Sequence, residues 1–172
     1  MAVLNVNPTR MELTRLKKQL STALRGHKLL KDKRDELMRQ FLDMIRETKT
    51  LREEVEERLK SVNNDFVLAS SVMSKEELDT ALLAPKQEVY LETSTRNVMS
   101  VDIPVYSFKT RTSEQSDIFS YGFASTSFEL DDAVSGLSDL LPKMLKLAEM
   151  EKSVKLMADE IEKTRRRVNA LE

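Results

Sequence analysis

Side chains able to do chemistry are few in this 172-residue chain. It contains no cysteine, which excludes disulfides, thiolate nucleophiles and cysteine-based zinc sites. His27 is the single histidine, and it falls on an apolar helical stripe, so we interpret it as a packed residue that helps to set helix register. No glycine-rich phosphate loop, Gly-x-Ser-x-Gly motif or paired-histidine motif occurs. The sequence therefore indicates neither an enzyme nor a cofactor or metal site.

Carboxylates are abundant, but they alternate with bases along the chain. The densest group comprises Glu53, Glu54, Glu56 and Glu57 with Arg52, Arg58 and Lys60. Such alternation is typical of a solvated helix face, where each ion pair contributes about 0.2–0.5 kcal/mol. The formal net charge of -1 also argues against nucleic acid as the main partner.

Two clusters of basic residues are the best candidates for a functional surface. The N-terminal cluster consists of Arg10, Arg15, Lys17 and Lys18, and the C-terminal cluster of Arg165, Arg166 and Arg167. One interpretation is ordinary solubilising charge; the other is an end of the molecule that docks on an acidic surface. If the helices that carry the clusters pair antiparallel, both clusters lie toward the same end.

A heptad repeat predicts that the N-terminal cluster lies on a long helix, from about Thr9 to about Asp65. The repeat positions are Leu13, Leu16, Leu20, Ala23, His27, Leu30, Arg34, Leu37, Phe41, Met44, Thr48, Leu51 and Val55. A helix of this length needs a partner helix, because propensity alone does not hold it. We expect Gly26 to allow a second helix to approach closely. Met38, Ile45 and Leu59 widen the apolar face, which indicates either a further partner or a thicker two-helix core.

A second heptad pattern runs from Thr126 to the last residue. Its positions are Leu130, Val134, Leu137, Leu141 and Met144, then, after a phase shift, Leu147, Met150, Val154, Met157, Ile161, Thr164, Val168 and Leu171. Gly136 and Pro142 lie at the shift, and we expect the proline to kink or break the helix. The repeat is still running at Glu172, so we expect the natural chain to continue beyond it.

The middle of the chain predicts a short helix from Ser74 to Pro85 and then a β-hairpin. The predicted strands are 88–93 and 98–108, separated by the polar residues 94–97. Pro104 must face an open edge or sit at a bulge, because it has no N–H to donate.

Together these patterns predict a mainly α fold: a long antiparallel two-helix coiled coil with an inserted short helix and β-hairpin. A composition of 33% charged and only 5% aromatic residues favours the same class. We divide the chain into 1–70 (the N-terminal long helix), 71–125 (short helix, hairpin and loop) and 126–172 (the C-terminal long helix). No run approaches the 18 apolar residues of a membrane span, and the N-terminus lacks a signal peptide. We expect a soluble, cytoplasmic protein.

Two stretches carry a resemblance to a known family. Residues 7–20 read Asn-Pro-Thr-Arg-Met-Glu-Leu-Thr-Arg-Leu-Lys-Lys-Gln-Leu, and residues 25–37 read Arg-Gly-His-Lys-Leu-Leu-Lys-Asp-Lys-Arg-Asp-Glu-Leu. With the hairpin and the Leu-Pro-Lys at 141–143, they closely resemble the D subunit of the V/A-type rotary ATPases, over essentially the whole chain. The length suits a bacterial or archaeal member.

The resemblance implies a non-catalytic central rotor shaft on the cytoplasmic face of the membrane. It serves ATP synthesis or the transport of protons or sodium. The free ends of the coiled coil would enter the catalytic hexamer of A and B subunits. The middle of the chain would contact the F subunit of the central stalk and the subunit that caps the membrane ring. The alternative function is a static coiled-coil adaptor or scaffold.

Residues can be assigned to these contacts as hypotheses. For the hexamer they are Arg10, Arg15, Lys17, Lys18, Arg165, Arg166 and Arg167. For the F subunit they are Met38, Ile45, Leu59, Val101, Ile103 and Val105.

Overall fold

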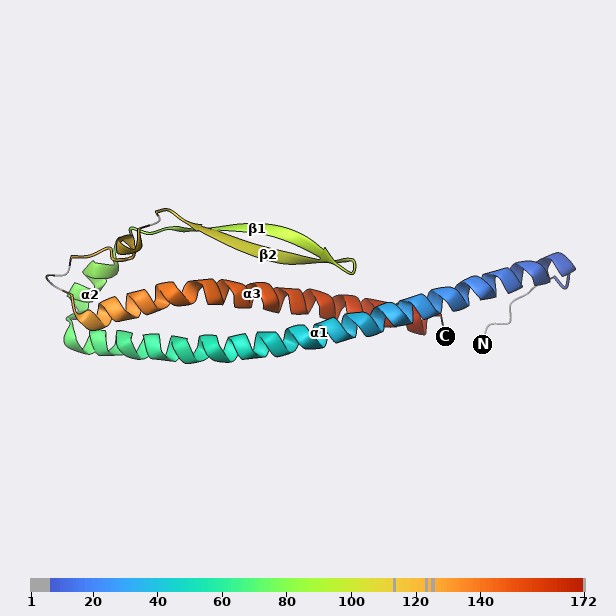
Figure 1. Cartoon of the computed structure of the whole chain (residues 1–172), viewed down its shortest axis with the longest axis horizontal. Coiled ribbons are helices and arrows are strands. Elements are labelled where there is room, and N and C mark those ends of the chain that lie inside the picture. Colours follow the sequence, from blue (N-terminus) through green and yellow to red (C-terminus); the bar gives the residue numbers. More distant parts are fainter. Residues whose placement is uncertain (1–6, 113, 123, 125, 172) are drawn as a thin grey trace. The chain divides into compact units, whose positions relative to one another are not determined.

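A computed structural model describes residues 7–112, 114–122, 124 and 126–171. It contains the elements α1 (Arg10–Val72), α2 (Lys75–Leu82), β1 (Val89–Val98), β2 (Val101–Thr110), η1 (Gln115–Ile118) and α3 (Phe128–Asn169) (Figure 1). The chain forms two compact units, one of residues 1–42 with 157–172 and one of residues 43–156. In each unit α1 packs against α3. The predicted fold class, two long helices with a short helix and a β-hairpin, is confirmed.

A hydrogen-bonded cap fixes the start of α1, and packing against other elements supports its end. At its start the hydroxyl of Thr9 accepts a hydrogen bond from the N–H of Glu12 (3.3 Å), which satisfies one of the free donors of the first turn. At its C-terminal end α1 runs to Val72, beyond the point near Asp65 where its heptad pattern fades. The last turns persist because Ala69 is fully buried in a cluster with Ala81 and Leu130. Tertiary packing thus supports a segment whose heptad pattern has faded.

In the unit of residues 43–156, α1 and α3 run antiparallel. Arg52 forms an ion pair with Glu151, and Glu54 one with Lys143, so increasing numbers on one helix meet decreasing numbers on the other. The buried positions of α3 here are Leu130, Ala133, Leu140 and Ser153. Leu137 is 48% exposed, so its assignment to the helix–helix contact is wrong.

The helix α3 continues without a break through Pro142, so of the two predicted outcomes, a kink or a break, the break does not occur. Pro142 is exposed, so its ring meets solvent rather than α1. Leu140 is buried and Lys143 is paired with Glu54, so packing holds the helix on either side of the missing N–H.

In the other unit α1 and α3 also pack against each other. Lys33 on α1 lies 3.8 Å from Glu160 on α3. The predicted heptad positions Leu37, Met157, Ile161, Thr164 and Val168 are buried. Leu20, however, is 61% exposed, and Leu13 and Leu16 are exposed as well. The helix α3 leaves this stretch uncovered, because α3 ends at Asn169 and its residues Glu160 and Arg165 already lie beside Lys33 and Arg34 of α1.

The close approach expected at Gly26 occurs instead at Gly136. A Cβ at Gly136 would lie 2.9 Å from Cγ2 of Val62, whereas one at Gly26 would meet no atom within 4 Å. Alanine at either site gains helix propensity of about 1 kcal/mol. At Gly136 this gain is opposed by an overpacking cost of about 1–3 kcal/mol.

We therefore expect Gly26→Ala to be more stable than Gly136→Ala by about 1–3 kcal/mol. Urea unfolding of the two variants, followed by circular dichroism at 222 nm, measures the difference. Equal stability would mean that Val62 moves aside without cost.

The hairpin pairs β1 with β2 in one unbroken antiparallel register, from Val89 opposite Thr110 to Val98 opposite Val101. Its turn is Met99–Ser100, with φ of 52° and 71°, the signs of a type I′ turn. The prediction that residues 94–97 separate the strands is wrong, because these residues pair within the ladder. Asn97 stabilises the turn, since its side-chain oxygen accepts the N–H of Ser100 (3.1 Å) and its amide donates to Asp102 (2.6 Å).

Candidate functional site

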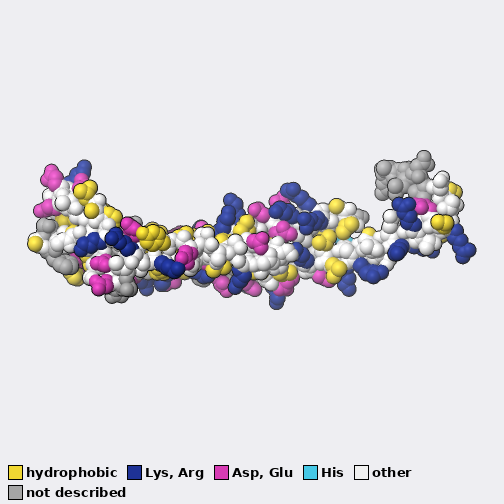
Figure 2. All heavy atoms as spheres, turned by 90° about the horizontal axis from the view of Figure 1, so that it is seen from above, with side chains coloured by type: hydrophobic (Ala, Val, Ile, Leu, Met, Phe, Trp, Pro, Cys, Tyr) yellow, Lys and Arg dark blue, Asp and Glu magenta, His cyan; other side chains and the backbone are white. Residues whose placement is uncertain are grey.

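The N-terminal basic cluster lies on the part of α1 whose apolar positions are exposed. Arg10, Arg15, Lys17 and Lys18 are all exposed. Arg15 pairs only loosely with Glu12, at 3.5 Å on the same helix. Figure 2 shows Lys and Arg side chains projecting from this part of the helix. The cluster therefore presents long cationic side chains to solvent.

The C-terminal basic cluster is exposed as well and lies in the last turns of α3. Arg166 forms an ion pair with Glu162 one turn earlier. This location suits cations, because the helix dipole is negative at its C-terminus. The two clusters share one unit, but the C-terminal one begins beside the Arg34 region of α1. At about 1.5 Å per residue, the N-terminal cluster extends more than about 20 Å further along the axis of α1.

Met38 lines a shallow groove of about 510 Å³ between α1 and α3. The groove is lined by Arg34, Asp35, Met38, Phe41, Ala158, Ile161, Glu162 and Arg165. Met38 is 39% exposed, so an apolar side chain lies open among charged ones. Such an arrangement fits an apolar anchor of a partner held within a polar rim.

Ile45 lines a second groove between the two helices, of about 380 Å³. This groove is lined by Ile45, Thr48, Lys49, Arg52, Glu151, Val154 and Lys155. Ile45 is 37% exposed, so a second apolar side chain lies open in this groove. Leu59, the third predicted residue on this helix, is only half-buried and lines neither groove.

The hairpin residues assigned to the F subunit are placed differently. Val101 and Ile103 are buried within this chain, and Val105 is half-buried. Glu149 of α3 fixes this part of β2, because its carboxylate accepts the N–H of Tyr106 (2.8 Å) and pairs with Lys146. Burial raises the pKa of Glu149, but the hydrogen bonds from Lys146 and the Tyr106 N–H outweigh it and lower the pKa below its usual value. Glu149 is thus an anion at neutral pH that ties the hairpin to α3.

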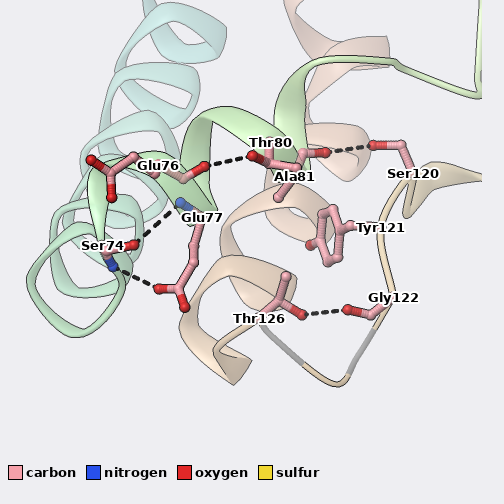
Figure 3. A pocket seen from close by; sticks show the side chains of 9 residues that line it. All are labelled: Ser74, Glu76, Glu77, Thr80, Ala81, Ser120, Tyr121, Gly122 and Thr126. Carbon is pink, nitrogen blue, oxygen red and sulfur yellow. Dashed lines mark hydrogen bonds between the residues drawn. The ribbon is translucent and has the colours of Figure 1, made fainter.

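A polar cavity of about 610 Å³ lies where α2 meets the loop before α3 (Figure 3). Its hydrogen-bonding groups are largely occupied within the chain. Ser74 and Glu77 form a reciprocal capping box, and the Ser120 hydroxyl donates to the carbonyl of Ala81 (3.1 Å). The Tyr121 hydroxyl donates to Asp131 (2.8 Å), and burial together with this carboxylate raises the tyrosine pKa. We therefore interpret the cavity as a structural junction rather than a binding site.

An apolar groove of about 430 Å³ in the same unit was not predicted. It is lined by Leu82, Pro85, Gln87, Val89, Ile118, Ser120, Tyr121, Val134, Leu137, Ser138, Leu141 and Met144. The groove explains why Leu137 is exposed: α3 is apolar on two faces here, one toward α1 and one toward this groove. The phase shift of the heptad pattern between Met144 and Leu147 was the one feature of the sequence that could have indicated a second apolar face on this helix.

Two further observations on the described residues bear on function. No three His, Cys, Asp or Glu side chains among them are arranged to hold a metal ion. Within the same residues, no helix has the length and apolar character needed to cross a membrane.

Comparison with known proteins gives consistent matches over the whole chain. The family model for the ATP synthase D subunit matches residues 12–172. The V-type ATP synthase D subunit of Acetivibrio thermocellus is 63% identical over 172 residues, which are 100% of this chain and 78% of that protein. The D subunits of Clostridioides difficile (62%) and Clostridium novyi (57%) also align with 100% of this chain, over 77% and 80% of their own lengths. The chain belongs to the ATP synthase D-subunit family.

Membership of the D-subunit family confirms the resemblance found at residues 7–20 and 25–37. The D subunit is the central-stalk rotor subunit of the V-type ATP synthase and is not catalytic. The basic clusters, the two α1–α3 grooves and the hairpin are therefore candidate surfaces for contacts within that assembly, not parts of an active site.

Proposed function

We propose that this chain transmits torque between a catalytic hexamer of A and B subunits and the ion-translocating ring in the membrane. The observation that carries the proposal is the N-terminal part of α1, where exposed cations surround leucines that no described helix covers. A shaft that turns inside a ring must avoid deep, interlocking contacts, because leaving each one would be too costly. Exposed ion pairs contribute only about 0–1 kcal/mol each, yet several together can position the shaft at each dwell.

We propose three contacts along this shaft. The two basic clusters face carboxylates of the hexamer. The F subunit binds beside Met38 in one unit and beside Ile45 in the other, because each of these exposed apolar side chains lines a groove between α1 and α3. The segment that carries α2 meets the subunit that caps the ring, and the exposed Leu82 and Leu83 supply apolar surface there. The complex works at the cytoplasmic face of the membrane.

The test of the hexamer contact is the triple variant Arg165→Gln, Arg166→Gln and Arg167→Gln. We expect the affinity for the A/B hexamer to fall by about tenfold at low salt. We also expect the reconstituted complex to hydrolyse ATP with weaker coupling to rotation. Affinity is measured by titration of the hexamer at several salt concentrations, and ATPase activity by reconstitution. Binding to the F subunit should be unchanged.

A matched control removes the same charge elsewhere. Arg46, Arg58 and Lys60 are exposed on α1 in the other unit, and their triple Gln variant should assemble like the parent. If the Arg165–Arg167 variant also assembles and hydrolyses ATP like the parent at every salt concentration, these arginines are only solubilising charge. A parent chain that binds the hexamer without activating its ATPase would favour the static scaffold instead.

A further inference from the structure

The outer edge of β2 is closed to further strand pairing. Arg111 donates its N–H to the carbonyl of Glu88 across the ladder, so odd-numbered residues of β2 point their N–H groups toward β1. Even-numbered residues point outward, and the N–H of Tyr106 is bound by Glu149 of α3. Pro104, also even-numbered, has no N–H, and the unbroken register places it at the strand edge rather than at a bulge. Toward the turn of the hairpin, Figure 1 shows β2 on the side of β1 that faces α3.

The outer edge of β1 has the opposite character. Its odd-numbered residues Val89, Leu91, Thr93, Thr95 and Asn97 pair with the outward-facing residues of β2, so their own N–H and C=O groups also point outward. Every residue from Val89 to Asn97 is exposed. The strand has ten residues and contains no proline, no lysine and no bulge, the usual means by which proteins guard such an edge.

The charges on β1 do not guard the edge either. Glu92 is held by Lys109 of β2 (2.6 Å). Glu88, just before the strand, lies 3.8 Å from Arg111. Arg96, the other charged residue of β1, lies near Glu149 of α3 and helps to lower the pKa of that carboxylate. The charged groups near the edge are therefore partly neutralised within this unit, and a row of outward-facing main-chain donors and acceptors remains.

We propose that the β1 edge pairs with an extended strand of another subunit of the ATP synthase. Main-chain hydrogen bonds to the five odd-numbered residues supply the contact, and side chains select the strand. The face of β1 that carries the odd-numbered residues is apolar at its start, where the exposed Val89 and Leu91 lie beside Phe108 of β2, and polar toward the turn, where Thr93, Thr95 and Asn97 follow. The matching strand is thus apolar where it passes Val89 and Leu91 and polar where it passes Thr93 to Asn97.

Another subunit fits this edge better than a second copy of the chain. Two copies joined through β1 would share only two ten-residue edges, whereas a stable interface buries about 1,200–2,000 Å². A neighbouring subunit adds the strand to whatever contacts it makes elsewhere on the shaft, so the edge need not supply all the binding free energy. The proposal rests on membership of the assembly and is independent of which residues carry torque.

Hydrogen exchange of individual amides tests the proposal in the assembled ATP synthase and in the free chain. In the free chain we expect the amides of Leu91, Thr93 and Thr95 to exchange fast, and in the complex at least about 100-fold more slowly. The even-numbered amides of β1 are bonded to β2 and should be protected in both states, as an internal control. Fast exchange of the odd amides in the complex overturns the proposal. So does protection in the free chain that rises with concentration together with a dimer in sedimentation, because the occupant is then a second copy.

A proline variant tests whether the edge contributes to assembly. Thr93→Pro removes an outward N–H and leaves the ladder to β2 intact, as Pro104 does on the other strand. The control, Thr93→Val, keeps the N–H and a similar side-chain shape. We expect Thr93→Pro to bind the rest of the complex about tenfold more weakly than Thr93→Val. Thr93→Lys, which guards the edge by charge without altering the backbone, should weaken binding similarly. Unchanged affinity of both Thr93→Pro and Thr93→Lys overturns the proposal.

Discussion

The variant Leu37→Asp is expected to unfold the helix pair formed by residues 1–42 and 157–172. Leu37 has an exposed fraction of 0%, and no described residue of that pair is better enclosed. A carboxylate at this position would be buried without a partner, which costs about 3–5 kcal/mol. That is a large part of the stability of an ordinary domain, about 5–15 kcal/mol. Helical signal at 222 nm and urea midpoints measure the loss.

The control for this prediction is Leu29→Asp, two turns earlier on the same helix. Leu29 is 69% exposed, so its carboxylate stays in water and the variant should change stability by at most about 0.5 kcal/mol. Ile161→Asp, at a buried position of α3, should behave like Leu37→Asp. Leu30 is only half-buried, and a charge there should cost less than one at Leu37. Equal stability of the Leu37→Asp and Leu29→Asp variants would contradict the burial of Leu37 in this helix pair.

The variants Met38→Glu and Ile45→Glu are expected to lose most of their affinity for the F subunit. Each places a charge in a groove between α1 and α3 that we assign to that partner. Central apolar anchors of an interface typically contribute at least about 2 kcal/mol, so each variant should bind about thirtyfold more weakly. Isothermal titration with the purified F subunit measures the affinity, and a thermal melt checks that the chain remains folded.

Leu29→Glu is the matched control for this contact. It lies nine residues before Met38, which at about 100° per residue places it on the opposite face of α1. Its affinity for the F subunit should equal that of the parent chain. If Met38→Glu and Ile45→Glu bind like Leu29→Glu, the two grooves are not the contact.

Deletion of residues 88–108 tests whether the F subunit binds to the helix pair or to the hairpin. Val101 and Ile103 are buried within this chain, so the direct contribution of the hairpin would come from Val105 or from the β1 edge. A deletion variant that binds like the parent would assign the contact to the helix pair alone.

The sequence by itself determined the class of fold and the family, because both rest on local patterns. A heptad repeat predicts that a helix packs against another helix, even when the partner helix is not known. Here it correctly predicted that Leu37, Met157, Ile161 and Val168 are buried. The lack of cysteine and the presence of a single histidine made most forms of catalysis improbable without any structure. The motifs at residues 7–20 and 25–37 led to the D-subunit family, and full-length identity of 57–63% to bacterial proteins of that name agrees.

Only the tertiary structure decided features that depend on what lies opposite a residue. Periodicity did not extend α1 to Val72, because packing of Ala69 against Ala81 and Leu130 holds its last turns. Periodicity also assigned Leu137 to the contact between α1 and α3. Here α3 is apolar on a second face, toward the groove, and a periodic pattern does not show which of two faces a residue belongs to.

The same holds for the closest helix contact and for the hairpin. The close approach at Gly136 rather than Gly26 depends on where Val62 of the other helix falls. Which edge of the hairpin is open depends on ladder register and on one carboxylate of α3, Glu149. Gly136 and Val62 are far apart in the chain, as are Tyr106 and Glu149, so a local sequence pattern reveals neither contact.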